Sequence, residues 1–194
     1  MPGEVAIYVA SPAQGELRQG EIISNLIQAR LDLTTVGSAS PPKVDLVKHQ
    51  LAVVISQDCD LLLDYNARNG IGDVKPDKLL PSILFCEVIT AEEMCSPENG
   101  INGRDRQLFG KNKLERFHFL QKVEREKDAM GEGLPELGID FKRYFSIPTD
   151  EVYKRFTLEA KRRCYMKSPY LEHLSNRFSH FQQRIALPED HRSE

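Results

Sequence analysis

The chain has 194 residues, 40% of them hydrophobic, and a formal net charge of −3, a composition that favours one globular core over a disordered chain. The charge is uneven, because residues 140–194 carry 11 Lys and Arg against 8 Asp and Glu, which leaves −6 for residues 1–139. This mild polarity lacks the strongly basic balance of a dedicated nucleic-acid-binding protein.

The cysteines and the start of the chain predict a cytoplasmic protein. Four cysteines, Cys59, Cys86, Cys95 and Cys164, occur at irregular spacings without a CxxC pair, so reduced thiols are expected rather than a disulfide framework. The opening MPGEVAIYVA lacks the basic segment of a signal peptide. No apolar run approaches the roughly 20 residues of a spanning helix, so no membrane partner is expected.

The first half of the chain is expected to consist mainly of strands. Leu51 to Ile55 is a continuous apolar run rich in β-branched residues, which predicts a strand buried on both faces at the centre of the fold. Ser82 to Ile89 predicts a neighbouring strand, and Val5 to Ala10 a short edge strand. Glu21 to Arg30 favours a strand, with a helix as the alternative. Thr34 to Lys43 predicts a Gly, Ser and Pro loop.

The second half mixes strands with helices. Ala91 to Met94 predicts a short helix and Ser96 to Gly110 a loop. Further strands are expected within Leu114 to Val123, Leu137 to Ile147 and Lys161 to Met166, with a helix from Thr149 to about Glu159. The last helix begins near Ser168 and carries an apolar stripe at spacings of three and four, formed by Leu171, Leu174, Phe178, Phe181 and Ile185.

These elements predict an α+β fold. We expect a curved, mainly antiparallel sheet, or an SH3-like barrel, with the C-terminal helices packed on it. Residues 1–148 would form the β-rich core domain, and residues 149–194 a helical extension packed on the same core.

Three predicted segments follow one another in the first half of the chain. They are a strand that opens with Gly20 and Glu21, the loop from Thr34 to Lys43, and a buried strand that starts at Ala52 and ends in Ser56. Over residues 16–90 this order resembles the start of MazF/PemK-type toxin barrels, although His49 and Gln50 stand where the family usually has Arg-Pro. The resemblance implies a small SH3-like sheet that pairs as a homodimer and, in active members, cuts single-stranded RNA.

The candidate catalytic residues are Asp58, Cys59, Asp60 and His118. In extended geometry Asp58 and Asp60 would share one face and could form an acid/base pair. The alternative is that these carboxylates cap a following turn or helix while Cys59 is buried. Cys59 could also act as a nucleophile with His118 as its base, or ligate zinc together with Asp60, Cys86 and His118. Because no ligands are paired at short spacing, no metal and no cofactor are predicted.

A basic stripe on the last helix is the candidate nucleic-acid interface. His173, Arg177, His180 and Arg184 recur at offsets of four, three and four, and basic residues precede them near Lys161. Such a stripe could bind phosphate oxygens, or it could be the solvated face of the helix. The predicted nucleic-acid-binding residues are Arg162, Arg163, Lys167, Arg177 and Arg184.

Two functions from different classes follow. The first is an RNA-binding or RNA-cleaving protein of bacterial type, related in fold to toxin barrels. The second is a non-enzymatic adaptor or regulatory subunit that binds another protein through its C-terminal helix. The sequence contains no P-loop, dinucleotide-binding glycine motif, HExxH or GxSxG.

Overall fold

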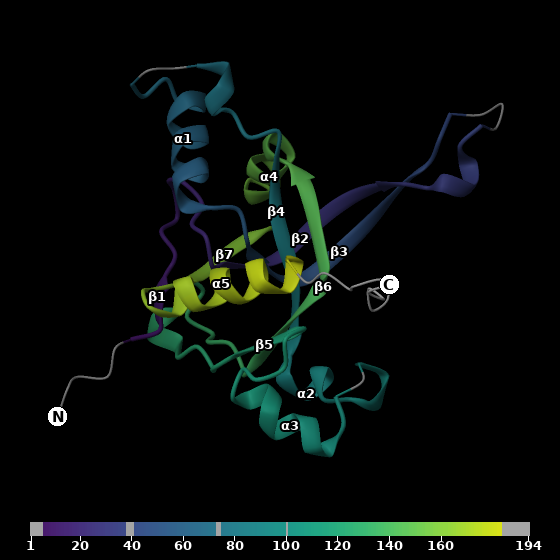
Figure 1. Ribbon diagram of the computed structural model, residues 1–194. Coiled ribbons are helices and arrows are strands. Elements are labelled where there is room, and N and C mark those ends of the chain that lie inside the picture. The colour runs from purple at the N-terminus through teal and green to yellow at the C-terminus, as the bar shows by residue number, and fades with distance from the viewer. Residues whose placement is uncertain (1–5, 38–40, 73–74, 100, 184–194) are drawn as a thin grey trace, which may run out of the picture.

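The computed structural model describes residues 6–37, 41–72, 75–99 and 101–183, and within these ranges the strands form one antiparallel sheet (Figure 1). The strands are β1 (Tyr8–Ala10), β2 (Glu21–Leu31), β3 (Val44–Val54), β4 (Ser82–Thr90), β5 (Phe117–Leu120), β6 (Leu137–Pro148) and β7 (Lys161–Met166). The helices are α1 (Asp58–Arg68), α2 (Ala91–Met94), α3 (Gly103–Gly110), α4 (Thr149–Phe156) and α5 (Tyr170–Gln182).

The sheet has the order β1-β7-β2-β3-β4-β6-β5 and is open, because β1 and β5 each pair with a single neighbour in the part of the chain that the structure describes. The α+β class, with an antiparallel sheet and helices packed on it, is therefore confirmed. Of the two expected forms, the structure has the open curved sheet and not a closed barrel.

The central position of the buried apolar run is also confirmed. Ala52, Val53 and Val54 of β3 have no exposed surface. Val53 pairs with Ile22 of β2 on one side and with Cys86 of β4 on the other. A strand with neighbours on both edges and packed side chains on both faces can be apolar at every position.

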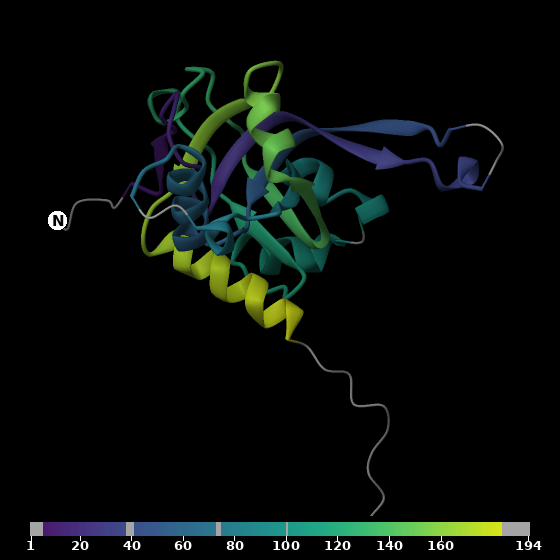
Figure 2. The same ribbon diagram turned by 90° about the horizontal axis from the view of Figure 1, so that it is seen from above.

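The two faces of the sheet carry separate cores. On one face, α5 lies across the sheet and buries Leu174, Phe178 and Phe181 against side chains that include Phe141 (Figure 2). On the other face, Leu61 of α1 and Val152 of α4 pack with residues of β2, β3, β4 and β6. The apolar stripe of the predicted terminal helix is thus the face that packs on the sheet. This holds for the described part of that helix.

The segment after residue 148 contributes a strand as well as helices. β7 lies between β1 and β2, where Met166 pairs with Tyr8 and Cys164 pairs with Ile22. The residues assigned to a helical extension therefore also complete the sheet.

A third, smaller core lies beside β5. There Met94 of α2 and Phe109 of α3 pack with Ile101 and Phe117. The predicted loop is wrong over Gly103–Gly110, which forms α3. The N-terminus of α3 is capped by the side chain of Asn102, which accepts hydrogen bonds from the backbone N–H groups of residues 104 and 105.

Half of the β2–β3 hairpin projects from the sheet (Figures 1 and 2). β2 pairs with β7 only over Glu21–Ser24, and β3 pairs with β4 only over Leu51–Val54. Among the described residues, 25–31 and 44–50 pair only with each other, and we call them the arm. None of the helices in the described ranges is long and apolar enough to cross a membrane.

Candidate functional site

Asp58 lies in the first turn of α1 rather than on a strand. Its carboxylate accepts hydrogen bonds from Arg18 Nε (3.2 Å), Arg18 Nη2 (2.9 Å) and the Gln19 backbone N–H (2.6 Å). The expected pairing of Asp58 and Asp60 on one strand face is wrong, because the chain turns into a helix directly after Gln57. Through these hydrogen bonds Asp58 instead links α1 to the segment before β2.

Cys59 and Asp60 are exposed on the same turn of α1. The Cys59 Sγ lies 3.7 Å from an Asp60 carboxylate oxygen. The expectation of a buried Cys59 is therefore wrong. A cavity of about 270 Å³ lies beside this turn, lined by residues that include Ser56, Asp60 and Leu174, and its lining among the described residues contains no histidine or arginine.

His118 lies apart from that turn. It is buried on β5, where its ring is 5.3 Å from the ring of His173 of α5, and its Nδ1 has no hydrogen-bond partner among the described residues. Both histidines line a cavity of about 230 Å³ together with Tyr8 and Met166. Burial, with smaller contributions from Arg177 and His173, lowers the pKa of His118 to about 3. Its imidazole is therefore neutral at physiological pH.

The residues considered for zinc do not form one cluster. Cys86 is buried in β4, while Cys59 contacts Gln57 and Asp60 on α1. Within the described ranges, no group of three or more His, Cys, Asp or Glu side chains could hold a metal ion. Likewise, no contact joins Cys59 to His118, which lies against Phe141 and His173.

Two of the predicted phosphate-binding arginines form ion pairs inside the protein. Arg162 is paired with the fully buried Glu21, and Arg163 is paired with the buried Asp128. Successive residues of a strand point to opposite faces, so these two neighbours cannot form one patch. Burial alone would raise the pKa of Asp128, but hydrogen bonds from Arg163 and from backbone N–H groups lower it overall.

The remaining predicted nucleic-acid-binding residues do not assemble a patch either. Arg177 donates its terminal N–H groups to the backbone oxygens of Asn112 (2.5 Å), Leu114 (2.5 Å) and Phe117 (2.8 Å). Lys167 is exposed between β7 and α5. Arg184, like Ile185 of the apolar stripe, lies outside the described residues.

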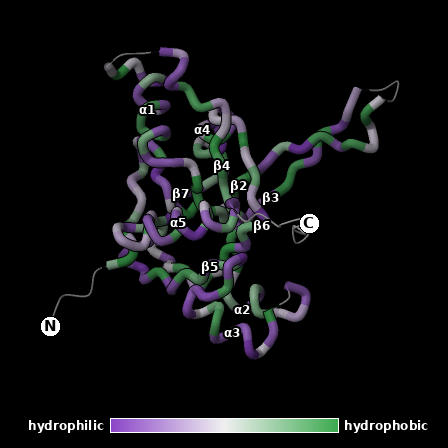
Figure 3. Tube along the Cα trace, in the orientation of Figure 1, coloured by the Kyte–Doolittle hydropathy of each residue, from purple (hydrophilic) through white to green (hydrophobic). Residues whose placement is uncertain are grey.

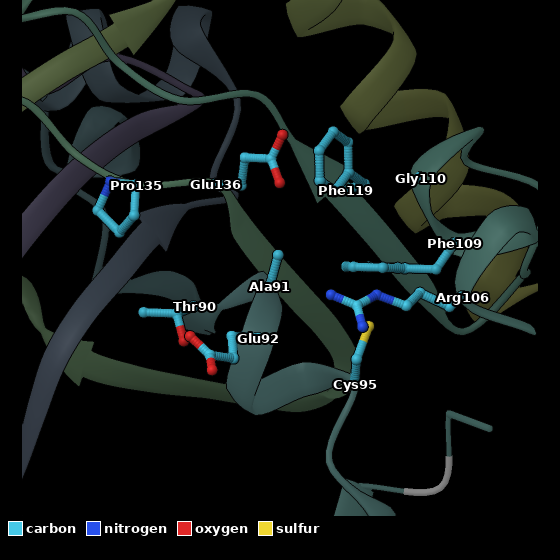
Figure 4. Close-up of a pocket in the computed structure, with 10 residues that line it drawn as sticks. All are labelled: Thr90, Ala91, Glu92, Cys95, Arg106, Phe109, Gly110, Phe119, Pro135 and Glu136. Carbon is cyan, nitrogen blue, oxygen red and sulfur yellow. The ribbon is translucent and has the colours of Figure 1, made fainter. Parts of the chain in front are cut away.

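A cavity of about 740 Å³ lies among α2, α3 and β5 and was not predicted. Arg106 and Glu136 point into it from opposite sides, Cys95 also lines it, and Phe109 and Phe119 supply apolar walls (Figure 4). An apolar wall with charged groups at its rim suits an amphipathic ligand. The sequence did not indicate this site, because Arg106 and Phe109 come from a segment expected to be a loop and Phe119 comes from a separate expected strand.

The arm has one polar and one apolar face. Residues directly opposite each other on paired strands share a face, and the pairs Arg30–Asp45 and Gln28–Val47 alternate with Ala29–Leu46 and Leu31–Val44. On the polar face, Gln28 donates to the Ser146 backbone oxygen, so this face turns toward β6 where the arm meets the sheet. Apolar and polar residues alternate along the arm in Figure 3.

The opposite face exposes aliphatic side chains to solvent. We define the apolar arm face as Ile27, Ala29, Leu31, Val44 and Leu46. Its three largest exposed members are Leu31 (51% exposed), Val44 (58%) and Leu46 (64%). The turn at the tip adds Leu33 (78%) and Val36 (51%). The alternation is visible in the sequence, but only the structure tells which face remains uncovered.

The sequence matches no family model and no curated protein. The resemblance to MazF/PemK-type barrels therefore stays a prediction.

Proposed function

We propose that this protein is an adaptor or regulatory subunit that engages another protein chain through the β2–β3 arm. The observation that carries the proposal is the apolar arm face, where neighbouring Leu31, Val44 and Leu46 are each more than half exposed. Contiguous apolar patches of this kind on soluble proteins mark sites of protein interaction.

The energetics of the arm support the same role. Beyond Ser24 and Leu51 the two strands pair with each other and with no third strand in the described part of the chain, and an isolated two-stranded hairpin is only marginally stable in water. A partner packed on the arm would remove aliphatic side chains from water, at about 1.5–3 kcal/mol for each side chain fully buried. A bound partner would therefore stabilise the arm.

The C-terminal helix is less suited to this role than the sequence suggested. Leu174, Phe178 and Phe181 of α5 already pack on the sheet of their own chain. RNA binding also has less support, because Arg162, Arg163 and Arg177 donate their hydrogen bonds to acceptors within the protein.

The proposal is tested by comparing two exposed leucines. Leu46→Asp places a charge on the apolar arm face, and Leu158→Asp makes the same change at a position after α4 that is 56% exposed. Each tagged variant is incubated with extract of the cells that produce the protein, and the retained chains, including untagged copies of the protein itself, are identified by mass spectrometry.

We expect at least one chain to be retained by the wild type and by Leu158→Asp but lost with Leu46→Asp. If the wild type, Leu158→Asp and Leu46→Asp retain the same set of chains, the proposal is contradicted. Retention of single-stranded RNA that weakens steeply with salt, and is unchanged by Leu46→Asp, would favour the RNA-binding alternative instead.

A further inference from the structure

We infer that the chain covering the apolar arm face is a second copy of this protein, so that two arms pack face to face in a homodimer. This inference rests on the proposed function, because it names the partner of the same surface.

The area is sufficient for a specific dimer. The exposed fractions of Leu31, Leu33, Val36, Val44 and Leu46 correspond to roughly 500 Å² of accessible surface per chain, backbone atoms included, which is at the upper end for a patch on a monomer. Two such surfaces in contact would bury about 1,000 Å² in total, which is the size at which specific interfaces begin. The tip and the face must both take part to reach this size.

The shape of the face suits a copy of itself. In a two-fold symmetric dimer the same patch meets itself, so it must be self-complementary. Ala29 lies directly opposite Leu46 on the neighbouring strand, and its small side chain leaves space beside Leu46. The leucine of each copy can therefore interleave with the leucine of the other around Ala29.

The charges allow this contact. The pair at the base of the face joins Ile27 to Lys48, which is exposed. Lys48 lies at the end of the face nearest the body of the molecule, so its ammonium group can stay in water when the apolar centre is covered. The Arg30–Asp45 pair lies on the opposite face, and no like charges are forced together in the centre of the contact.

Sedimentation equilibrium of the purified full chain tests the inference without any other protein present. We expect the wild type and Leu158→Asp to move from monomer to dimer with rising concentration in the micromolar range, typical of interfaces at the small end. Leu46→Asp and Val44→Asp should each raise the dissociation constant at least about 100-fold, because they bury a charge at the centre of an apolar contact. Circular dichroism checks that all variants are folded, as expected for exposed positions.

A wild type that stays monomeric up to about 100 µM, the weak limit for a contact of this size, would overturn the inference. So would a dimer that neither Leu46→Asp nor Val44→Asp weakens, since its interface must then lie elsewhere. A monomeric wild type that still retains a different chain in an arm-dependent way would leave the proposed function standing and reject only the second copy as partner. If the wild type neither forms a dimer nor retains any chain in an arm-dependent way, the homodimer and the proposed function are both rejected.

Discussion

The carboxylate of Glu21 accepts two hydrogen bonds from the guanidinium of Arg162, at 2.6 Å from Nε and 2.9 Å from Nη2. The remaining donors of Arg162 reach the backbone oxygens of Gly15 and Glu16. This one side chain therefore joins β7 both to the start of β2 and to the segment that precedes it.

Arg162→Met is expected to lower the free energy of unfolding by roughly 3–5 kcal/mol, because it leaves the fully buried Glu21 carboxylate without its counter-charge. Urea unfolding followed by circular dichroism measures the change. The double variant Arg162→Met with Glu21→Gln serves as the control and should recover part of the loss, since the buried charge is then gone. A single variant that loses less than about 1 kcal/mol would show that Glu21 does not depend on this partner.

Gly133 is expected to be much less replaceable than Gly131, although both have positive φ angles, 75° and 69°. A Cβ at Gly133 would lie 2.8 Å from the Val123 backbone oxygen, whereas one at Gly131 would meet nothing within 4 Å. Gly131→Ala should cost about 1 kcal/mol from backbone strain alone, and Gly133→Ala about 2–4 kcal/mol from strain and collision together. Thermal and urea unfolding of the two variants give the difference, and equal losses would contradict this account.

Acid should destabilise the protein through His118. Burial, followed by Arg177 and His173, lowers the pKa of this histidine from 6.5 to about 3 in the folded chain. Between those values the unfolded chain binds a proton that the folded chain does not. The contribution of neutral His118 to the free energy of unfolding is therefore complete above pH 6.5. It is lost as the pH falls toward 3, by up to about 1.4 kcal/mol per pH unit.

His118→Gln removes this titration, so the variant should show a flatter dependence of unfolding free energy on pH between 6.5 and 4. Leu120→Val, a neighbouring buried change on β5, is the control and should cost about 1 kcal/mol at every pH without changing the slope. The same slope in His118→Gln as in the wild type would assign the acid sensitivity to other groups.

Cys59 should be the first thiol of the native protein to react with DTNB, because it is exposed on α1 while Cys95 is only partly exposed and Cys86 and Cys164 are buried. Burial, followed by Asp128, raises the pKa of the Cys164 thiol to about 12, and burial likewise raises the pKa of Cys86. We expect Cys59 to react at least about 100-fold faster than either. Cys59→Ser should abolish the fastest phase, and persistence of that phase in the variant would refute the assignment.

The apolar runs of the sequence were sufficient to predict most of the sheet. Leu51–Val54 forms the last part of β3, and Ser82 to Ile89 lies within β4, since continuous apolar runs rich in β-branched residues have no comparably stable alternative. The earlier residues of β3, from Val44 to Gln50, were not predicted as a strand. Local signals failed at α3. Its eight residues contain only two large apolar side chains, Leu108 and Phe109, so its stability comes from packing of Phe109 against β5 rather than from its own pattern.

The candidate sites were harder to predict, because their chemistry depends on partners that are distant in the sequence. Arg162 and Arg163 are adjacent basic residues in the chain, yet one pairs with Glu21 and the other with Asp128 on the opposite face of the strand. The exposed side of the arm depends in the same way on where β4 and β7 stop pairing. Neither fact is contained in the local pattern of residues.

The position of β7 has a consequence for how the chain folds. Of the strands that the structure describes, β7 alone pairs with β1, and the registered partners Tyr8 and Met166 are separated by most of the polypeptide. During synthesis on the ribosome, β1 therefore has no strand to pair with until Lys161–Met166 has been synthesised. The edge of β2 that pairs with β7 stays unpaired for the same time. Closure of such a long loop is slow compared with formation of the local β2–β3 hairpin, so the order of assembly runs from the middle of the sheet outward.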